Sequence, residues 1–261
     1  MKEFLLLSLV FEIPDTYNNL HLSKLSVQRL KGGDDLLKYI WLKDKKPILK
    51  QLPRTFKSAA LLLHPFVQMP SGWEESIREN SYQHIYPSDE EILTIGKPVP
   101  WQKVMLDCGF ASSEEVALAL ITSIGAFIEK YRREDLADRL NLHLRPDYFY
   151  PTEDHTSVFL MDRLLKVMGS NGAKELYFSD PISGDNGLLT INDTSSLDLC
   201  DLSGHELIVT DENRDYAFMS LYDSFITLLI AKDEHIGDIV QTMKFEAIIC
   251  DQKTSVNWYL Q

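Results

Sequence analysis

Two short segments carry the residue types best suited to chemistry. The first is His64–Trp73, and His84 and Tyr86 follow it closely. Imidazoles among aromatic rings suit a small-ligand pocket, but the favoured interpretation is a loop that prolines and a tryptophan pack onto a core. In the second segment, Asp223 stands between two apolar strands, either to cap a tight turn or as a functional carboxylate. If His64 met Asp223, the acid would fix the imidazole tautomer and the pair would serve as a general base.

These residues give two sets of candidates. His64 and Asp223 are the candidate catalytic groups. Trp73, His84 and Tyr86 are the candidate binding groups. A general base needs its carboxylate within hydrogen-bond reach, or one water away, so the catalytic hypothesis depends on how the chain folds.

Motifs for metal or cofactor binding are missing from the sequence. The seven histidines form no HxH or HExxH motif and no i, i+4 pair, and the sequence has no Walker A, GxSxG or GxGxxG motif. The three cysteines are widely spaced and form no CxxC pair, so we expect reduced, buried thiols. The sequence predicts no cofactor and no local metal site, while a site assembled from distant segments stays open.

Charge is unevenly distributed along the chain. Residues 1–60 carry 11 Lys/Arg and 6 Asp/Glu, a net charge of +5, whereas residues 146–261 carry 7 and 20, a net charge of −13. The whole chain has a formal net charge of −13, which repels phosphate backbones and argues against a nucleic-acid partner. A basic segment at residues 43–57 lacks interleaved aromatic residues, so we interpret it as a solvated face.

The pattern of elements predicts an α+β fold, with a mostly helical N-terminal half packed on a largely antiparallel C-terminal sheet. Capping boxes at Ser88 and Ser112 each begin a helix, and the second helix is expected to be buried over 116–128 and to continue to about residue 140. Short apolar strands dominate after residue 175, and we expect helices to cover one face of their sheet. Residues 1–261 are predicted to form a single composite domain, with a possible subdivision into residues 1–150, mainly helical, and 151–261, sheet-rich.

The N-terminal apolar run predicts a buried strand and not a secretion signal. Glu3 precedes Phe4–Phe11, the run is short, and no small-residue cleavage site follows it. The apolar stretch Val116–Ile128 is too short to span a bilayer. We therefore expect a cytoplasmic protein that does not associate with membranes.

Four segments resemble a known bacterial family. These are His64–Trp73, Tyr86–Glu91, Thr122–Gly125 and Tyr222–Phe225, and they are similar to segments of the family known as domain of unknown function 2711, from spore-forming bacteria. The resemblance covers most of the chain from about Trp41 onward. It implies a bacterial, cytoplasmic setting and assigns no catalytic or binding residue.

Two classes of function follow from these observations. The acidic C-terminal half favours a non-enzymatic protein that binds a basic partner, such as an immunity-type inhibitor or a regulatory protein. The alternative is a small-molecule hydrolase whose His/carboxylate site lies near His64 and Trp73. A third possibility concerns assembly, because the basic segment of one copy could meet the acidic half of another in a homodimer.

Overall fold

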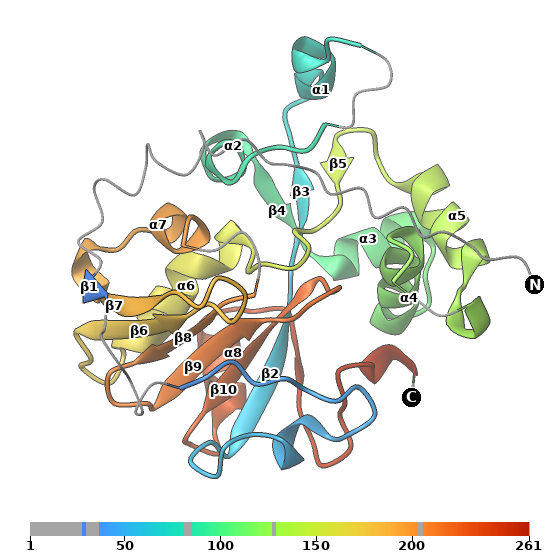
Figure 1. Cartoon of the computed structure of the whole chain (residues 1–261). Helices are drawn as coiled ribbons and strands as arrows, with labels where there is room; N and C mark the ends of the chain where they lie inside the picture. The colour runs from blue at the N-terminus through green and yellow to red at the C-terminus, as the bar shows by residue number, and fades with distance from the viewer. Residues whose placement is uncertain (1–27, 30–36, 81–84, 127–128, 203–205, 261) are drawn as a thin grey trace, which may run out of the picture.

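The fold is α+β, as the sequence predicts, with an extensive antiparallel sheet (Figure 1). The computed structural model describes residues 28–29, 37–80, 85–126, 129–202 and 206–260. The predicted N-terminal strand at Phe4–Phe11 lies outside this range. Within it, the helices are α1 Trp73–Ile77, α2 Asp89–Ile95, α3 Trp101–Cys108, α4 Ser113–Ser123, α5 Glu134–His143, α6 Val158–Gly169, α7 Ser196–Cys200 and α8 Ile236–Thr242.

The large sheet has the strand order β1-β7-β6-β8-β9-β10-β2-β11, and every neighbouring pair is antiparallel. A smaller sheet has the order β4-β3-β5. The strands are β1 Gln28–Arg29, β2 Ser58–Leu63, β3 Phe66–Gln68, β4 Lys97–Val99, β5 Tyr148–Phe149, β6 Glu175–Ser179, β7 Asn186–Thr190, β8 Ile208–Asp211, β9 Tyr216–Ser220, β10 Ile226–Ala231 and β11 Ala247–Ile249.

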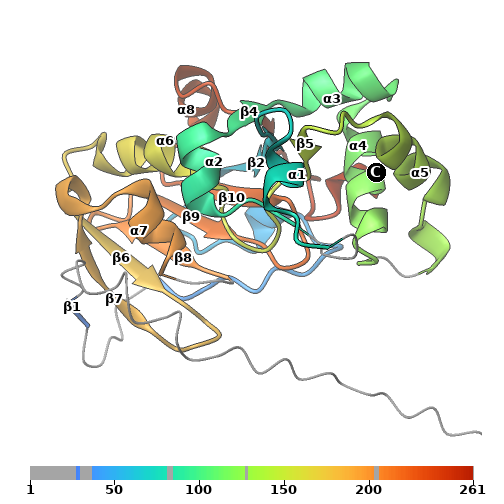
Figure 2. The same cartoon turned by 90° about the horizontal axis from the view of Figure 1, so that it is seen from above.

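Both faces of the sheet are buried along β8, β9, β10 and β2, which corrects the expectation of a single covered face. Successive side chains of β2 alternate between two hydrophobic cores, with Leu61 in one and Leu62 in the other. The first core includes α3, α4 and α5, and the second includes α6, α7 and α8. In both views α3, α4 and α5 gather at the opposite end of the molecule from β6 and β7 (Figures 1 and 2). The apolar runs of β2 and β10 are continuous because neither face meets water.

The predicted long helix is two helices. The structure ends α4 at Ser123, and Gly125 follows with a φ of +74°, a conformation that favours glycine. Among the described residues, a side chain at Gly125 would meet only the Arg132 side chain, so the expected close approach of another backbone is not found there. The chain then reverses, and α5 packs against α4. Leu120 is fully buried, as predicted for the centre of this element.

Other local predictions met mixed outcomes. The capping box of Ser88 forms as predicted, whereas Ser112 makes no side-chain capping bond. Residues 37–42 contain no helix, and residues Trp258–Leu260 form a short 3-10 helix. The three cysteines are free and buried, as predicted. None of the helices in the described parts of the chain is long and apolar enough to cross a membrane.

Candidate functional site

Three carboxylates meet where two turns of the chain lie against each other. Glu153 and Asp154 belong to the connection between β5 and α6, and Asp223 belongs to the turn between β9 and β10. One oxygen of each lies within 4.8 Å of the others. We call these three residues the carboxylate cluster.

Two hydrogen bonds, one to a side chain and one between backbone groups, join the two turns and bring the three acids together. The amide of Asp223 donates to Oδ1 of Asp154 at 2.7 Å, and the amide of Asp154 donates to the carbonyl of Ser224 at 3.1 Å. Asp154 and Asp223 both have left-handed backbone, with φ of 64° and 48°. Aspartate tolerates this conformation better than most residues, which fits its presence at both positions.

The cluster holds negative charge that the described chain does not neutralise. Burial, followed by the charges of Asp154 and Asp223, raises the pKa of Glu153 from 4.5 to about 7. Burial and the charge of Asp154 also raise the pKa of Asp223. Within the described residues, none of the three forms an ion pair with a basic side chain. A proton on Glu153 therefore relieves the repulsion among the three carboxylates.

His64 lies in the interior beside the same loop. Its Nδ1 donates to the carbonyl of Thr152 at 2.7 Å, and its Nε2 lies 2.8 Å from the hydroxyl of Thr227, which donates to it. The side chain is fully buried, and burial lowers its pKa to about 3 despite the bond to Thr152. The Thr156 hydroxyl extends this network, 3.0 Å from that of Thr227. The imidazole is thus neutral, and both of its nitrogens are engaged.

The two catalytic candidates, His64 and Asp223, both bind the loop at residues 152–154, but they do not bond to each other. His64 holds the carbonyl of Thr152, and Asp223 binds Asp154 two residues further on. Their hydrogen bonds hold the loop at Thr152 and at Asp154, the residues on either side of Glu153. A catalytic role for either residue stays a prediction, and the geometry gives both a positioning role.

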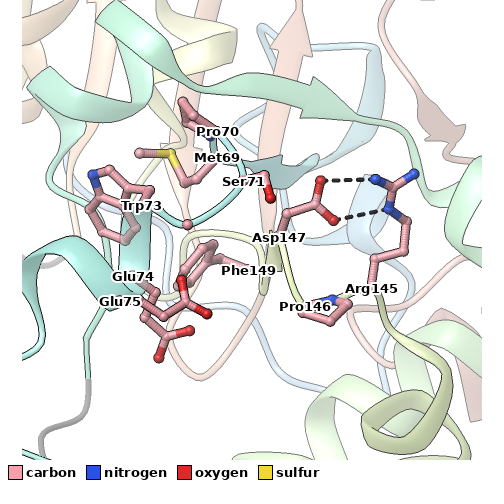
Figure 3. A pocket seen from close by; sticks show the side chains of 11 residues that line it. Met69, Pro70, Ser71, Trp73, Glu74, Glu75, Arg145, Pro146, Asp147 and Phe149 are labelled. Carbon is pink, nitrogen blue, oxygen red and sulfur yellow. Dashed lines mark hydrogen bonds and ion pairs between the residues drawn. The ribbon is translucent and has the colours of Figure 1, made fainter.

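A pocket of about 210 Å³ opens beside Trp73 (Figure 3). Gly72, with a φ of +79°, turns the chain into α1, and the Trp73 ring then lies edge-on to Phe149 with centroids 5.3 Å apart. On the other side of Phe149, Arg145 binds both oxygens of Asp147 at 2.9 and 3.0 Å. Although burial raises it, the bonds from Arg145 and Gln68 hold the pKa of Asp147 below its usual value. Trp73 therefore lies at a pocket, as the binding prediction requires.

Tyr86 contacts the same aromatic residue from elsewhere in the chain. Its ring is edge-on to Phe149 with centroids 6.3 Å apart, and its hydroxyl donates to the carbonyl of Tyr150 at 2.8 Å. The structure thus brings Trp73 and Tyr86 to one residue. The third binding candidate, His84, lies outside the described residues.

Sequence reasoning missed Glu153, Asp154 and Phe149. The signal for the acids was the polar run 152–155 directly after Pro151. In this run, Nε2 of His155 lies 3.6 Å from a carboxylate oxygen of Asp89, the first residue of α2. Phe149 carries no signal of its own, because an aromatic residue in a strand predicts packing.

Comparison with known proteins identifies the family. A family model described as "Protein of unknown function (DUF2711)" matches residues 44–260. The "Uncharacterized protein YwbB" of Bacillus subtilis (strain 168) is 49% identical over 224 residues, which are 86% of this chain and 100% of that protein. No solved structure matches the chain. The chain therefore belongs to the DUF2711 family, as the four resembling segments predict.

Proposed function

We propose that this protein is a non-enzymatic binding protein that receives a basic partner protein at the carboxylate cluster. One observation carries the proposal: three acids lie within 4.8 Å of one another, and no basic side chain of the described chain pairs with them. A lysine or arginine of a partner would supply the missing charge. The excess of acids in residues 146–261 would also steer such a partner toward this half of the chain.

The surroundings of the cluster suit a protein partner. Tyr222, next to Asp223, is 64% exposed. Tyrosine is enriched at protein interfaces because its ring gives contact area and its hydroxyl a polar handle. A cavity of about 320 Å³ lies beside it, and its lining includes Tyr222, Asp223 and Tyr259 together with Lys45, which forms no ion pair with Asp223. An aromatic residue next to unpaired carboxylates favours a cationic side chain as the bound group.

Proton linkage gives this binding a defined pH dependence. A cation at the cluster favours the ionised form of Glu153, whose pKa is about 7 in the free protein. Binding must therefore displace the proton below that pH, and affinity should rise as the pH increases through about 7.

The setting we propose is the bacterial cytoplasm, and the role is that of an immunity-type inhibitor or a regulatory protein. A second copy of this chain is another basic partner, because the segment 43–57 could reach the cluster in a homodimer. The small-molecule hydrolase near His64 and Trp73 ranks second. It would need His64 as a base, and both ring nitrogens of that residue are already engaged.

Affinity capture from the native lysate tests the proposal when three forms of the protein are compared. The cluster variant carries Glu153→Gln, Asp154→Asn and Asp223→Asn. The matched control carries Asp233→Asn, Glu234→Gln and Asp238→Asn, which make the same acid-to-amide replacements at three exposed positions. We expect one basic protein to be retained by the parent and the control, lost by the cluster variant, and released in about 0.5 M salt.

Quantification of the captured protein decides the outcome. Retention by the parent should be stronger at about pH 8 than at about pH 6. Equal recovery of the same proteins by all three forms would contradict a role for the cluster. Light scattering across the same salt series separates the homodimer from a different partner.

A further inference from the structure

At the edge of the pocket beside Trp73, the chain has matched one carboxylate–aromatic pair with a guanidinium; Asp147 lines the pocket, whereas its aromatic neighbour Tyr148 lies outside the lining. Arg145 binds both oxygens of Asp147, and its guanidinium carbon lies 4.9 Å from the centre of the Tyr148 ring. A planar cation is thereby held by an acid and an aromatic ring. Guanidinium suits this arrangement because it pairs with a carboxylate through two parallel bonds and stacks on aromatic rings.

A second carboxylate–aromatic pair in the pocket has no such cation. Glu75 is exposed and makes no hydrogen bond or ion pair with any described residue, whereas its neighbour Glu74 is paired with Arg78. Figure 3 shows the two glutamates on one side of Phe149 and Asp147 on the other. Trp73 and Phe149 meet at an interplanar angle of 86°, so they form a corner of two aromatic rings at the pocket wall.

We propose that this pocket binds a small organic cation of the guanidinium type. Glu75 would pair with its charge, the ring of Phe149 would contact its flat face, and Trp73, nearly perpendicular to Phe149, would border its edge. The volume of about 210 Å³ is below the roughly 300–1,000 Å³ typical of drug-sized ligands, which restricts the ligand to the size of a side chain. A guanidinium fits better than a primary ammonium, because it is more weakly hydrated and planar. This site is separate from the carboxylate cluster and does not depend on the proposed function.

Calorimetric titration with butylguanidinium and butylurea tests the charge requirement directly. The two compounds have nearly the same shape, but only the first is a cation. We expect saturable binding of butylguanidinium in the millimolar range or tighter and no heat of binding from butylurea. Absence of butylguanidinium binding, or equal binding of butylurea, would overturn the proposal.

Variants identify the site. Glu75→Gln should weaken butylguanidinium binding about tenfold or more, because a charged, two-oxygen acceptor is replaced by a neutral amide with one acceptor oxygen. The matched control Glu90→Gln, on the exposed face of α2, should leave it unchanged. Both changes are at exposed positions, so folding is not at risk. Unchanged affinity in Glu75→Gln would overturn the proposal even if butylguanidinium binds elsewhere.

One further titration distinguishes two kinds of guanidinium ligand, an arginine side chain of a polypeptide and a free small molecule. N-acetylarginine amide presents the same group on a peptide backbone. If it binds as tightly as butylguanidinium, the pocket accepts an arginine side chain of a polypeptide. If it binds more weakly while butylguanidinium still requires Glu75, the pocket takes a free small cation. Both results support a guanidinium site.

Discussion

His64 and the carboxylate cluster lie on two sides of the same loop and have opposite electrostatic character. In the interior, both nitrogens of His64 are hydrogen-bonded and the ring is neutral. At the cluster, three acids face one another with no basic partner among the described residues. A buried polar group that is fully bonded stabilises a fold, whereas clustered like charges cost stability unless something is bound. The difference separates a structural polar group from a candidate for recognition.

The two sites should also oppose each other in the pH dependence of stability. The folded pKa of His64 is below its ordinary 6.5, so its contribution is complete above 6.5 and is lost as the pH falls toward about 3. The folded pKa of Glu153 is above its ordinary 4.5, so the folded state holds its proton more tightly, and stability falls as the pH rises from 4.5 to about 7. Substitutions at His64 and at Glu153 should therefore change the stability of the fold with opposite dependence on pH.

The largest expected effect comes from His64→Ala. The change removes a fully buried ring, leaves the carbonyl of Thr152 without its donor and takes a partner from Thr227. We expect a loss of about 3 to 5 kcal/mol in the free energy of unfolding, from the cavity and the broken bonds together. Urea denaturation at neutral pH measures it. His143→Ala, at an exposed position, should change stability by less than about 0.5 kcal/mol, and equal losses in both variants would refute the structural role of His64.

Glu153→Gln should have a smaller, pH-dependent effect. Glutamine cannot ionise, so the variant should be more stable than the parent at about pH 8 and nearly unchanged at about pH 5. Urea midpoints at the two pH values give the comparison. Glu90→Gln serves as the control and should shift both midpoints alike. If Glu153→Gln also shifted both alike, the carboxylate would not be perturbed in the folded state.

Asp223→Asn should have the smallest effect. Asparagine adopts left-handed backbone as readily as aspartate, so the turn should be preserved while one charge is removed. We expect a gain of about 0.3 to 1 kcal/mol at about pH 8 that shrinks in about 0.5 M salt, because Asp223 is partly exposed and its repulsion is screened. Thermal unfolding at low and high salt measures it. A gain independent of salt would assign the effect to backbone conformation.

Much of the fold could be predicted from local sequence. The strand at Glu175–Ser179 and the capping box at Ser88 depend on alternation and on neighbouring residues, and both were found. The end of α4 was missed because the apolar pattern continues past Ser123, whereas tertiary packing turns the chain at Gly125. The second buried face was missed because a continuous apolar strand was not interpreted as two-sided burial.

The sites were predicted only in part, because their residues come together through tertiary structure. His64, Trp73 and Asp223 were identified from unusual residue types, and each lies at or next to one of the two sites described. Their partners come from other segments, since Phe149 joins Trp73 and the pair Glu153 and Asp154 joins Asp223. Spacing along the chain cannot show such a meeting. Burial also changes chemistry, because a histidine that suggests a base becomes a neutral structural group.

The central claim is that the carboxylate cluster carries charge that the protein itself does not neutralise. An NMR titration of the side-chain carboxyl carbon of Glu153 tests it most directly, with Glu153→Gln to assign the signal. The account predicts a titration midpoint near 7 in the folded protein and a fall of that midpoint when Asp154 and Asp223 are replaced by asparagine. A midpoint close to the ordinary 4.5, unaffected by those replacements, would contradict it.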